Sequence, residues 1–168
     1  MATDYEKVYQ ASRRALGEPT QVYVDFFQRY EKESAHVLDV GCGQGRDALF
    51  IARLGHHVTA IDWAPSGIRD LSKDAAAEDL DIDAEVIDIR DFKPKHQYDI
   101  VVIDRTLHML KADERLLRTM SACVCAGGVV LLADERSNIP AFLAFLDASE
   151  HRWQPILQKR GYLFVYRD

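Results

Sequence analysis

Short apolar runs alternate with amphipathic stretches along most of the chain. From residue 36 onward, the runs HVLDV, HVTAI, AEVI, DIVVI and GVVLLAD are rich in β-branched residues and predict five buried strands. The spacing of apolar positions between and after them predicts helices over residues 46–54, 65–77, 112–125 and 139–149. Strands joined by helices in this order indicate a parallel sheet that is covered on both faces.

The C-terminal end departs from this alternation. Residues 153–158 and 162–167 are strand-like, and Lys159-Arg160-Gly161 between them is typical of the turn of an antiparallel hairpin. Five parallel strands and this hairpin predict a seven-stranded, mostly parallel sheet. A chain of 168 residues with 48% hydrophobic side chains has the size of one domain. We therefore expect one domain over residues 1–168, with residues 35–168 as its α/β core.

The first 34 residues carry a different pattern, which predicts two amphipathic helices, over about residues 3–16 and 19–33. Tyr5 and Tyr9 lie one helical turn apart, on one face of the first helix. The short C-terminal connections leave no room for a substrate domain, so we expect residues 1–34 to form a helical lid over the ligand site. Alternatively, the aromatic side chains of this segment only pack the helices onto the sheet.

The first predicted strand runs into a turn that is rich in glycine. Gly41, Gly43 and Gly45 follow the strand, and the next helix begins directly after them. Closely spaced glycines between a strand and a helix let a ligand approach the backbone. Asp62 ends the second strand, where a carboxylate can accept hydrogen bonds from both hydroxyls of a ribose. The pattern favours a site for a nucleoside cofactor over an ordinary tight connection.

Two residues distinguish between the two large classes of nucleoside cofactor. The dinucleotide motif G-x-G-x-x-G needs its third glycine where this chain has Arg46. Asp39, beside the turn, would repel a pyrophosphate but would attract the ammonium group of a methionine moiety. S-adenosylmethionine carries that ammonium group and no phosphate, so the sequence favours it over NAD. An NAD-dependent oxidoreductase is correspondingly disfavoured.

Long stretches of the chain resemble a known enzyme family. HVLDVGCGQGRDALFIARLGHHVTAIDWAPSGI is similar to the first two motifs of class I S-adenosylmethionine-dependent methyltransferases, and DIRDF, YDIVVIDRTLHML and AGGVVLLADE resemble the later motifs in order and spacing. Within the first stretch, GRDALFIARLGHHVTAID is particularly similar to the tellurite-resistance and thiopurine methyltransferase branch. The resemblance covers about residues 36–135. It implies a Rossmann-like fold and methyl transfer from S-adenosylmethionine, with S-adenosylhomocysteine as product.

The resemblance also implies a set of cofactor-binding residues. These are Asp39, Gly41, Cys42, Gly43, Gly45 and Arg46 around the methionine end, Asp62 at the ribose, and Trp63, Asp88 and Ile89 at the adenine. Asp104, after the fourth strand, would contribute a backbone carbonyl, unless it forms a structural ion pair with Arg46 or Arg105. Trp63 can instead pack on a helix. Asp88 can instead cap a helix or turn, and Asp91 competes with it for the adenine contact.

The candidate catalytic residues lie after the fourth and fifth strands and near the N-terminus. Methyl transfer needs an in-line nucleophile and a site that excludes water, but no covalent enzyme intermediate. His108 is a candidate base because histidine titrates near neutrality, and Arg136, next to Glu135, can bind an anionic acceptor. Tyr5 and Tyr9 complete the set. Each of the five can instead have only a structural or solvated role.

Charge and composition narrow the expected partners. A net charge of −6, without any run of more than two Lys or Arg, argues against nucleic acid. The chain begins without a signal peptide and has no membrane span, and its three cysteines fit reduced thiols, so we expect a cytosolic protein away from membranes. We expect no metal. The predicted acceptor is a small thiol or chalcogen, carboxylate or amine, and the protein a monomer or homodimer. A non-catalytic binding module or partner subunit is the alternative.

Overall fold

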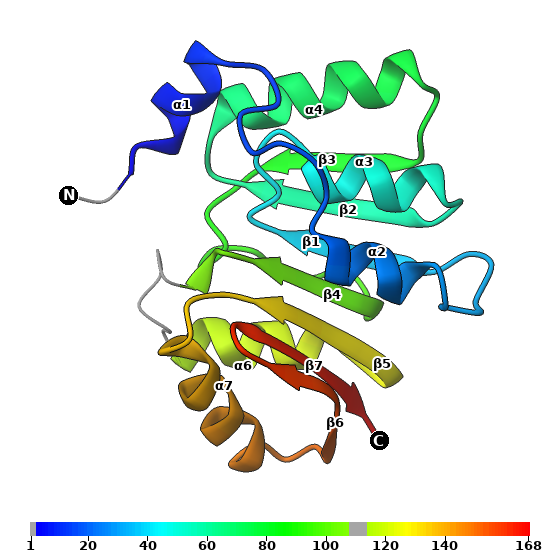
Figure 1. Cartoon of the computed structure of the whole chain (residues 1–168), viewed down its shortest axis with the longest axis vertical. Coiled ribbons are helices and arrows are strands. Elements are labelled where there is room, and N and C mark those ends of the chain that lie inside the picture. Colours follow the sequence, from blue (N-terminus) through cyan, green and yellow to red (C-terminus); the bar gives the residue numbers. More distant parts are fainter. Residues whose placement is uncertain (1–2, 108–113) are drawn as a thin grey trace. The chain divides into compact units, whose positions relative to one another are not determined.

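The computed structural model describes residues 3–107 and 114–168, and the chain divides into two compact units, Met1–Ile89 and Arg90–Asp168 (Figure 1). The first unit contains the helices α1 (Tyr5–Ala11), α2 (Gln21–Phe27), α3 (Arg46–Arg53) and α4 (Pro65–Ala77), and the strands β1 (His36–Val40), β2 (His57–Asp62) and β3 (Ile82–Val86). The second contains β4 (Tyr98–Asp104), α6 (Glu114–Cys123), β5 (Val124–Ala133), α7 (Asn138–Asp147), β6 (Trp153–Lys159) and β7 (Tyr162–Arg167).

The sheet of the first unit has β2 at its centre, with β1 and β3 parallel to it on either side. The strands form because their apolar β-branched residues are buried: Val37 and Val58, which pair across β1 and β2, are both 0% exposed. α3 connects β1 to β2, and α4 connects β2 to β3 (Figure 1). Both helices therefore begin at the carboxyl ends of strands, where parallel α/β sheets bind ligands.

The second unit combines a parallel pair of strands with an antiparallel hairpin. β4 and β5 are parallel, β7 pairs antiparallel with β5, and β6 pairs antiparallel with β7. Gly161, at φ +79°, closes the turn between β6 and β7, a left-handed conformation that glycine adopts without steric cost. Together the described residues supply seven strands, mostly parallel and ending in the predicted hairpin. The predicted fold class is confirmed.

The N-terminal helices are shorter than the sequence predicts. α1 ends at Ala11, and Arg14 and Gly17 lie beyond it at φ +52° and +73°, left-handed conformations that an α-helix excludes. α2 ends at Phe27, after which the amides of Arg29 and Tyr30 bond in three-residue turns. β5 begins earlier than predicted, at Val124 rather than at residue 128. That residues 1–34 act as a lid stays a prediction.

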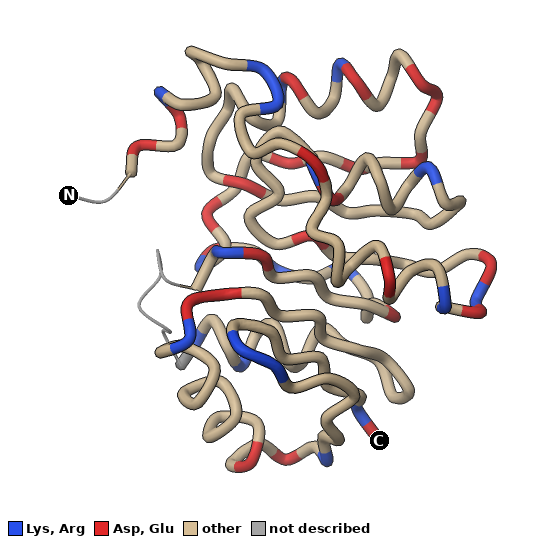
Figure 2. The backbone as a smooth tube through the Cα atoms, in the orientation of Figure 1, with Lys and Arg blue, Asp and Glu red and all other residues tan. Residues whose placement is uncertain are grey.

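Charged residues are distributed along the backbone without a basic segment. Figure 2 shows the Lys and Arg positions scattered among Asp and Glu positions, in agreement with the net charge of −6. Over residues 3–107 and 114–168, no helix combines the length and apolar character needed to cross a bilayer. The cytosolic location and the monomeric or homodimeric state stay predictions.

Candidate cofactor-binding site

The glycine turn between β1 and α3 is built from left-handed backbone. Gly41, Gly43 and Gly45 have φ values of +74°, +54° and +79°, which side-chain-bearing residues rarely adopt. The amides of Gly41 and Cys42 both donate to the carbonyl of Ile61, at 2.8 and 3.1 Å. The three spaced glycines therefore let the chain reverse beside the end of β2 and then start α3.

Asp62 at the end of β2 faces this turn and is 7% exposed. Its Oδ2 accepts a hydrogen bond of 2.9 Å from the amide of Gly43, and its Oδ1 accepts one of 2.8 Å from the amide of Ala64. Burial raises the pKa of this carboxyl group, and the backbone hydrogen bonds oppose that shift in part. Since each carboxylate oxygen can accept more than one hydrogen bond, Asp62 retains acceptor capacity for a ligand hydroxyl.

Asp39 lies in the strand just before the turn, and Cys42 lies within the turn. Asp39, in β1, is 3% exposed. Burial, and then the charges of Asp39 and Asp62, raise the pKa of the Cys42 thiol well above its usual value. The thiol therefore stays protonated and behaves as a small apolar group. Two carboxylates within electrostatic range of one buried sulfur make this end of the turn favourable for a positive charge.

Tyr9 covers the turn from the side of α1. A Cβ atom added at Gly43 would clash with the Tyr9 hydroxyl, so the phenol lies directly against the glycine. Burial, and then the charge of Asp62, raise the pKa of Tyr9, which keeps its hydroxyl protonated and makes it a hydrogen-bond donor rather than a base. The Tyr5 ring, half-buried, lies 5.8 Å from the ring of Tyr9, on the same helix face as predicted.

A fourth glycine, which the sequence reasoning missed, supports the turn from α4. A Cβ atom at Gly67 would lie 2.8 Å from the carbonyl oxygen of Gly43 and 3.1 Å from Cδ2 of Tyr9. The first turn of α4 therefore packs so closely against the glycine turn that only hydrogen fits at this position. The signal in the sequence was a glycine just inside a helix that begins with proline, where glycine is otherwise unfavourable.

The residues predicted to bind adenine gather at the ends of β2 and β3. The amide of Ile87 donates to the carbonyl of Asp62 at 2.9 Å, which places the chain after β3 beside the chain after β2. Trp63 is 50% exposed, Asp88 is half-buried and Ile89 is buried. A large aromatic side chain left half in water suits a planar ligand.

Arg46 begins α3 directly after the turn. Its guanidinium donates to Oδ2 of Asp47 through Nε at 3.2 Å and through a terminal nitrogen at 2.8 Å. Only 14% of its side chain is exposed, so the pair is well shielded from water. Arg46 thus brings a positive charge to the start of the helix, and Asp47 holds it there.

The remaining predicted residues lie in the second unit. Asp104 ends β4 half-buried, and Glu135 and Arg136 follow β5 at exposed positions. His108 falls outside the described residues. Arg105 has φ +52°, and its amide donates to the carbonyl of Ala133 at 2.7 Å, so the backbone turns sharply where β4 ends.

Asp134, which the sequence reasoning also missed, organises this edge of the second unit. It is 8% exposed and accepts hydrogen bonds from the amide of Leu107 at 2.9 Å, the amide of Glu135 at 2.7 Å and the side chain of Asn138 at 2.6 Å. One buried carboxylate therefore ties the loop after β4 to the start of α7. The sequence signal that could have identified Asp134 is its place at the end of a buried apolar run.

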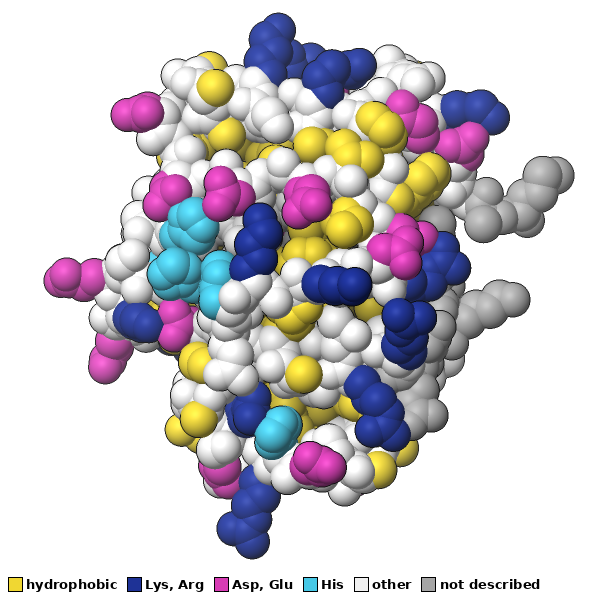
Figure 3. Space-filling view, turned by 180° about the vertical axis from the view of Figure 1, so that it is seen from behind, with side chains coloured by type: hydrophobic (Ala, Val, Ile, Leu, Met, Phe, Trp, Pro, Cys, Tyr) yellow, Lys and Arg dark blue, Asp and Glu magenta, His cyan; other side chains and the backbone are white. Residues whose placement is uncertain are grey.

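Histidine side chains gather beside acidic ones on the face seen in Figure 3. The rings of His36 and His57 are 5.1 Å apart, and Nδ1 of His57 lies 2.8 Å from a carboxylate oxygen of Asp81. His56 is buried, and its Nδ1 accepts from the amide of Ala35 at 3.2 Å. In the parts of the chain that the structure describes, no group of three or more metal-ligating side chains has a geometry that could hold a metal ion.

The fold, which carries the glycine turn and the acidic residue at the end of β2, is shared with solved structures of S-adenosylmethionine-dependent methyltransferases. The family model described as "Tellurite resistance protein TehB" matches residues 22–151. The chain therefore belongs to the TehB family. The predicted family is confirmed.

Individual relatives and solved structures are also similar to this chain. "Hemagglutinin 1" of Eikenella corrodens is 30% identical over 112 residues, which cover 64% of this chain and 37% of that protein. "Probable S-adenosyl-L-methionine-dependent methyltransferase TehB" of Haemophilus influenzae is 29% identical over 113 residues, 65% of this chain and 40% of that protein. The chain thus spans about two fifths of the length of these relatives. A S-adenosylmethionine-dependent methyltransferase from Aquifex aeolicus shares the fold, with a TM-score of 0.73 at 16% identity, over 99% of this chain and 98% of that one.

Proposed function

We propose that the protein transfers a methyl group from S-adenosylmethionine to a small-molecule acceptor whose nucleophilic atom is a soft chalcogen. The observation that carries the cofactor assignment is the pairing of Asp62 with the amide of Gly43, at 2.9 Å, across a turn of left-handed glycines. This pairing puts an ionisable acceptor for ribose hydroxyls beside backbone that a ligand can approach.

The residues at the turn fit the charges of this cofactor. Asp39 and Asp62 provide negative charge beside the turn, which suits an ammonium and a sulfonium group, and Arg46 provides the positive charge that suits a carboxylate. The half-exposed Trp63 offers its ring to the adenine. When bound, S-adenosylmethionine supplies a methyl carbon that an in-line lone pair attacks, while the C–S bond breaks and its electron pair returns to sulfur. The protein's task is to hold the two reactants in line and exclude water.

The titration of the groups at the turn favours an acceptor that is already an anion. Tyr9 and Cys42 both have raised pKa values and stay protonated at neutral pH, so neither can take a proton from an acceptor. A thiolate or another chalcogen anion needs no base for methyl transfer. The description of the family as a tellurite resistance protein supports the same acceptor class.

The cofactor half of this proposal is tested by calorimetric titration with S-adenosylhomocysteine. We expect a dissociation constant in the micromolar range for the wild type, weakened by about 100-fold in Asp62→Ala, because two shielded charged hydrogen bonds are lost. Asp147→Ala is the matched control, since Asp147 is an exposed carboxylate of α7 that is not a candidate cofactor ligand. A wild type that does not bind the compound contradicts the proposal.

The acceptor half is tested by release of S-adenosylhomocysteine in the presence of S-adenosylmethionine and thiols, selenite, tellurite, carboxylates or amines. We expect turnover with the chalcogen compounds and background rates with the others. Turnover only with amines or carboxylates contradicts the chalcogen assignment and leaves the methyltransferase assignment intact. Tight binding without turnover on any acceptor supports the alternative of a non-catalytic binding module.

A further inference from the structure

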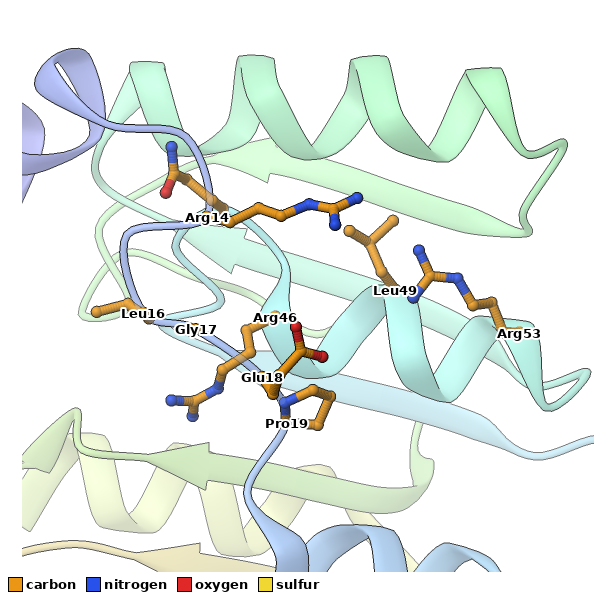
Figure 4. Close-up of a pocket in the computed structure, with 9 residues that line it drawn as sticks. Arg14, Leu16, Gly17, Glu18, Pro19, Arg46, Leu49 and Arg53 are labelled. Carbon is orange, nitrogen blue, oxygen red and sulfur yellow. The ribbon is translucent and has the colours of Figure 1, made fainter.

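The segment that carries Tyr9 to the glycine turn has little apolar contact of its own. We call residues 5–16 the N-terminal strap. After α1, its residues 12–14 and Leu16 are exposed to solvent. Figure 4 shows this stretch, from Arg14 to Pro19, running beside α3, where it lines a cavity of ≈ 60 Å³. Tyr9 is the buried side chain of the strap, so the rest of the segment depends on polar attachments to stay in place.

Several of these attachments meet at Gln44, the residue between the second and third glycines of the turn. Its side-chain Oε1 accepts from the amide of Ala15 at 2.9 Å, and its Nε2 donates to the carbonyl of Ser12 at 2.9 Å and to Oδ2 of Asp70 at 2.8 Å. The carbonyl of Tyr9 lies 3.5 Å from the same nitrogen. These partners fix the orientation of the Gln44 side-chain amide. The backbone N–H of Ala15 faces its oxygen, and the two acceptors, Ser12 and Asp70, face its nitrogen.

Two further contacts fasten the strap to α4. The carboxylate of Glu6 accepts from the amide and the hydroxyl of Ser66, at 3.0 and 2.6 Å, and Arg13 pairs with Asp74. These contacts join the strap to α4, whereas Gln44, like Gly43 against the Tyr9 ring, belongs to the glycine turn itself. If the glycine turn shifts, Gln44 shifts with it, and the hydrogen bonds that hold the strap change.

We propose that Gln44 is a positioning residue that couples the N-terminal strap to the cofactor turn, so that the strap closes Tyr9 over a bound cofactor and the cofactor in turn holds the strap closed. The inference rests on the proposed function, because it takes the glycine turn as the cofactor site. Linkage requires the two effects to be equal: the factor by which strap closure strengthens cofactor binding is the factor by which cofactor binding stabilises closure.

Tryptic cleavage at Arg13 and Arg14 measures strap opening without any cofactor. Both residues are exposed, but cleavage requires the local backbone to leave its hydrogen bonds, so the rate follows the population of the open strap. In Gln44→Glu, the donor that faces Asp70 and Ser12 becomes an anion. We expect about tenfold faster cleavage, detected by mass spectrometry of the N-terminal fragment, and about tenfold weaker binding of S-adenosylhomocysteine.

A second substitution separates coupling from simple damage. In Gln44→Glu with Asp70→Asn, the new amide at position 70 can donate to the new carboxylate at position 44, so the hydrogen bond to α4 re-forms with its polarity reversed, whereas the carbonyl of Ser12 still faces a carboxylate oxygen. We expect the free energy of unfolding to recover relative to Gln44→Glu, while cleavage stays about tenfold faster and binding about tenfold weaker than in the wild type, because the strap itself is not re-attached. Gln44→Met, which keeps the length of the side chain without its polar atoms, replaces Gln44→Glu if that variant fails to fold. Gln21→Ala, at an exposed glutamine of α2, is the matched control and changes neither measurement.

The outcomes distinguish this inference from the proposed function. If the wild type does not bind S-adenosylhomocysteine, the proposed function fails, whatever the cleavage rates are. If the wild type binds it, the inference predicts slower cleavage at Arg13 and Arg14 in its presence, and loss of most of that protection in Gln44→Glu. Binding without protection, or equal or tighter binding by Gln44→Glu, overturns the coupling and leaves the cofactor site in place.

Discussion

An oxygen of the Asp62 carboxylate accepts a 2.9 Å hydrogen bond from the amide of Gly43, 19 residues earlier in the chain. Hydrogen bonds to a charged group contribute about 1.5–3 kcal/mol when they are shielded from water. Asp62 is therefore more than a candidate ligand for ribose, because the same carboxylate fixes the turn that the cofactor would approach. The acidic residue and the glycines form one structural unit.

Asp62→Asn should therefore affect stability as well as binding. The amide retains one oxygen acceptor but loses the charge and presents N–H groups toward backbone donors. We expect the free energy of unfolding to fall by about 1–3 kcal/mol in urea denaturation. Asp91→Asn, at an exposed position, should change it by no more than about 0.5 kcal/mol. If the two variants have the same free energy of unfolding, the hydrogen bond between Asp62 and Gly43 contributes nothing to stability.

Gly67→Ala tests the close packing of α4 against the glycine turn. The added Cβ would lie 2.8 Å from backbone oxygen of Gly43, which cannot move aside as a flexible side chain can. We expect a loss of about 1–3 kcal/mol in the free energy of unfolding and weaker binding of S-adenosylhomocysteine. In Gly17→Ala the added Cβ meets nothing within 4 Å, so only the strain of φ +73° remains. That variant should lose about 1–2 kcal/mol and bind as the wild type does.

The alternating core and the main elements of the site could be predicted from the sequence because both are local patterns. α4 was predicted at the observed bounds, Pro65–Ala77, since apolar positions at helical spacing follow a proline that can begin a helix. The glycine turn was predicted because positive φ values require glycine at fixed spacing. Asp62 was found by its place at the end of an apolar run.

What the sequence did not predict depends on which elements pack together. Gly67 and Gln44 matter because the start of α4 and the N-terminal strap converge on the glycine turn, and no local pattern encodes that convergence. The first helix was predicted too long because Arg14 adopts a left-handed conformation for which its residue type gives no warning. Asp134 was missed for a related reason, since its three donors come from separate segments.

The raised pKa of Asp62 predicts two pH dependences of opposite sign. Ribose hydroxyls need the ionised carboxylate, so affinity for S-adenosylhomocysteine should fall as the pH is lowered through the raised pKa, which lies above the usual range of aspartate. The folded protein holds the proton more tightly than the unfolded chain, so the contribution of Asp62 to stability is present at low pH and is lost as the pH rises through the same pKa. Calorimetry between pH 4 and pH 8 measures the affinity, and urea denaturation over the same range measures the free energy of unfolding. Both are compared with the same measurements on Asp62→Asn. If the differences in affinity and in free energy of unfolding between the wild type and Asp62→Asn do not change with pH, the raised pKa of Asp62 is contradicted.

Asp134→Ala tests whether the edge formed by the loop after β4 serves the acceptor rather than the cofactor. The substitution leaves the buried amide of Leu107 and the amide of Glu135 without their carboxylate acceptor, so we expect a loss of about 2–4 kcal/mol in the free energy of unfolding. Binding of S-adenosylhomocysteine should stay within about threefold of the wild type, because the glycine turn and Asp62 belong to the first unit. The value of kcat/KM for the acceptor should fall by about tenfold or more, since the loop is no longer held in place. Asp147→Ala, at an exposed position of α7, is the control and should change none of the three. Loss of S-adenosylhomocysteine binding in Asp134→Ala, with folding retained, would assign this edge to the cofactor instead.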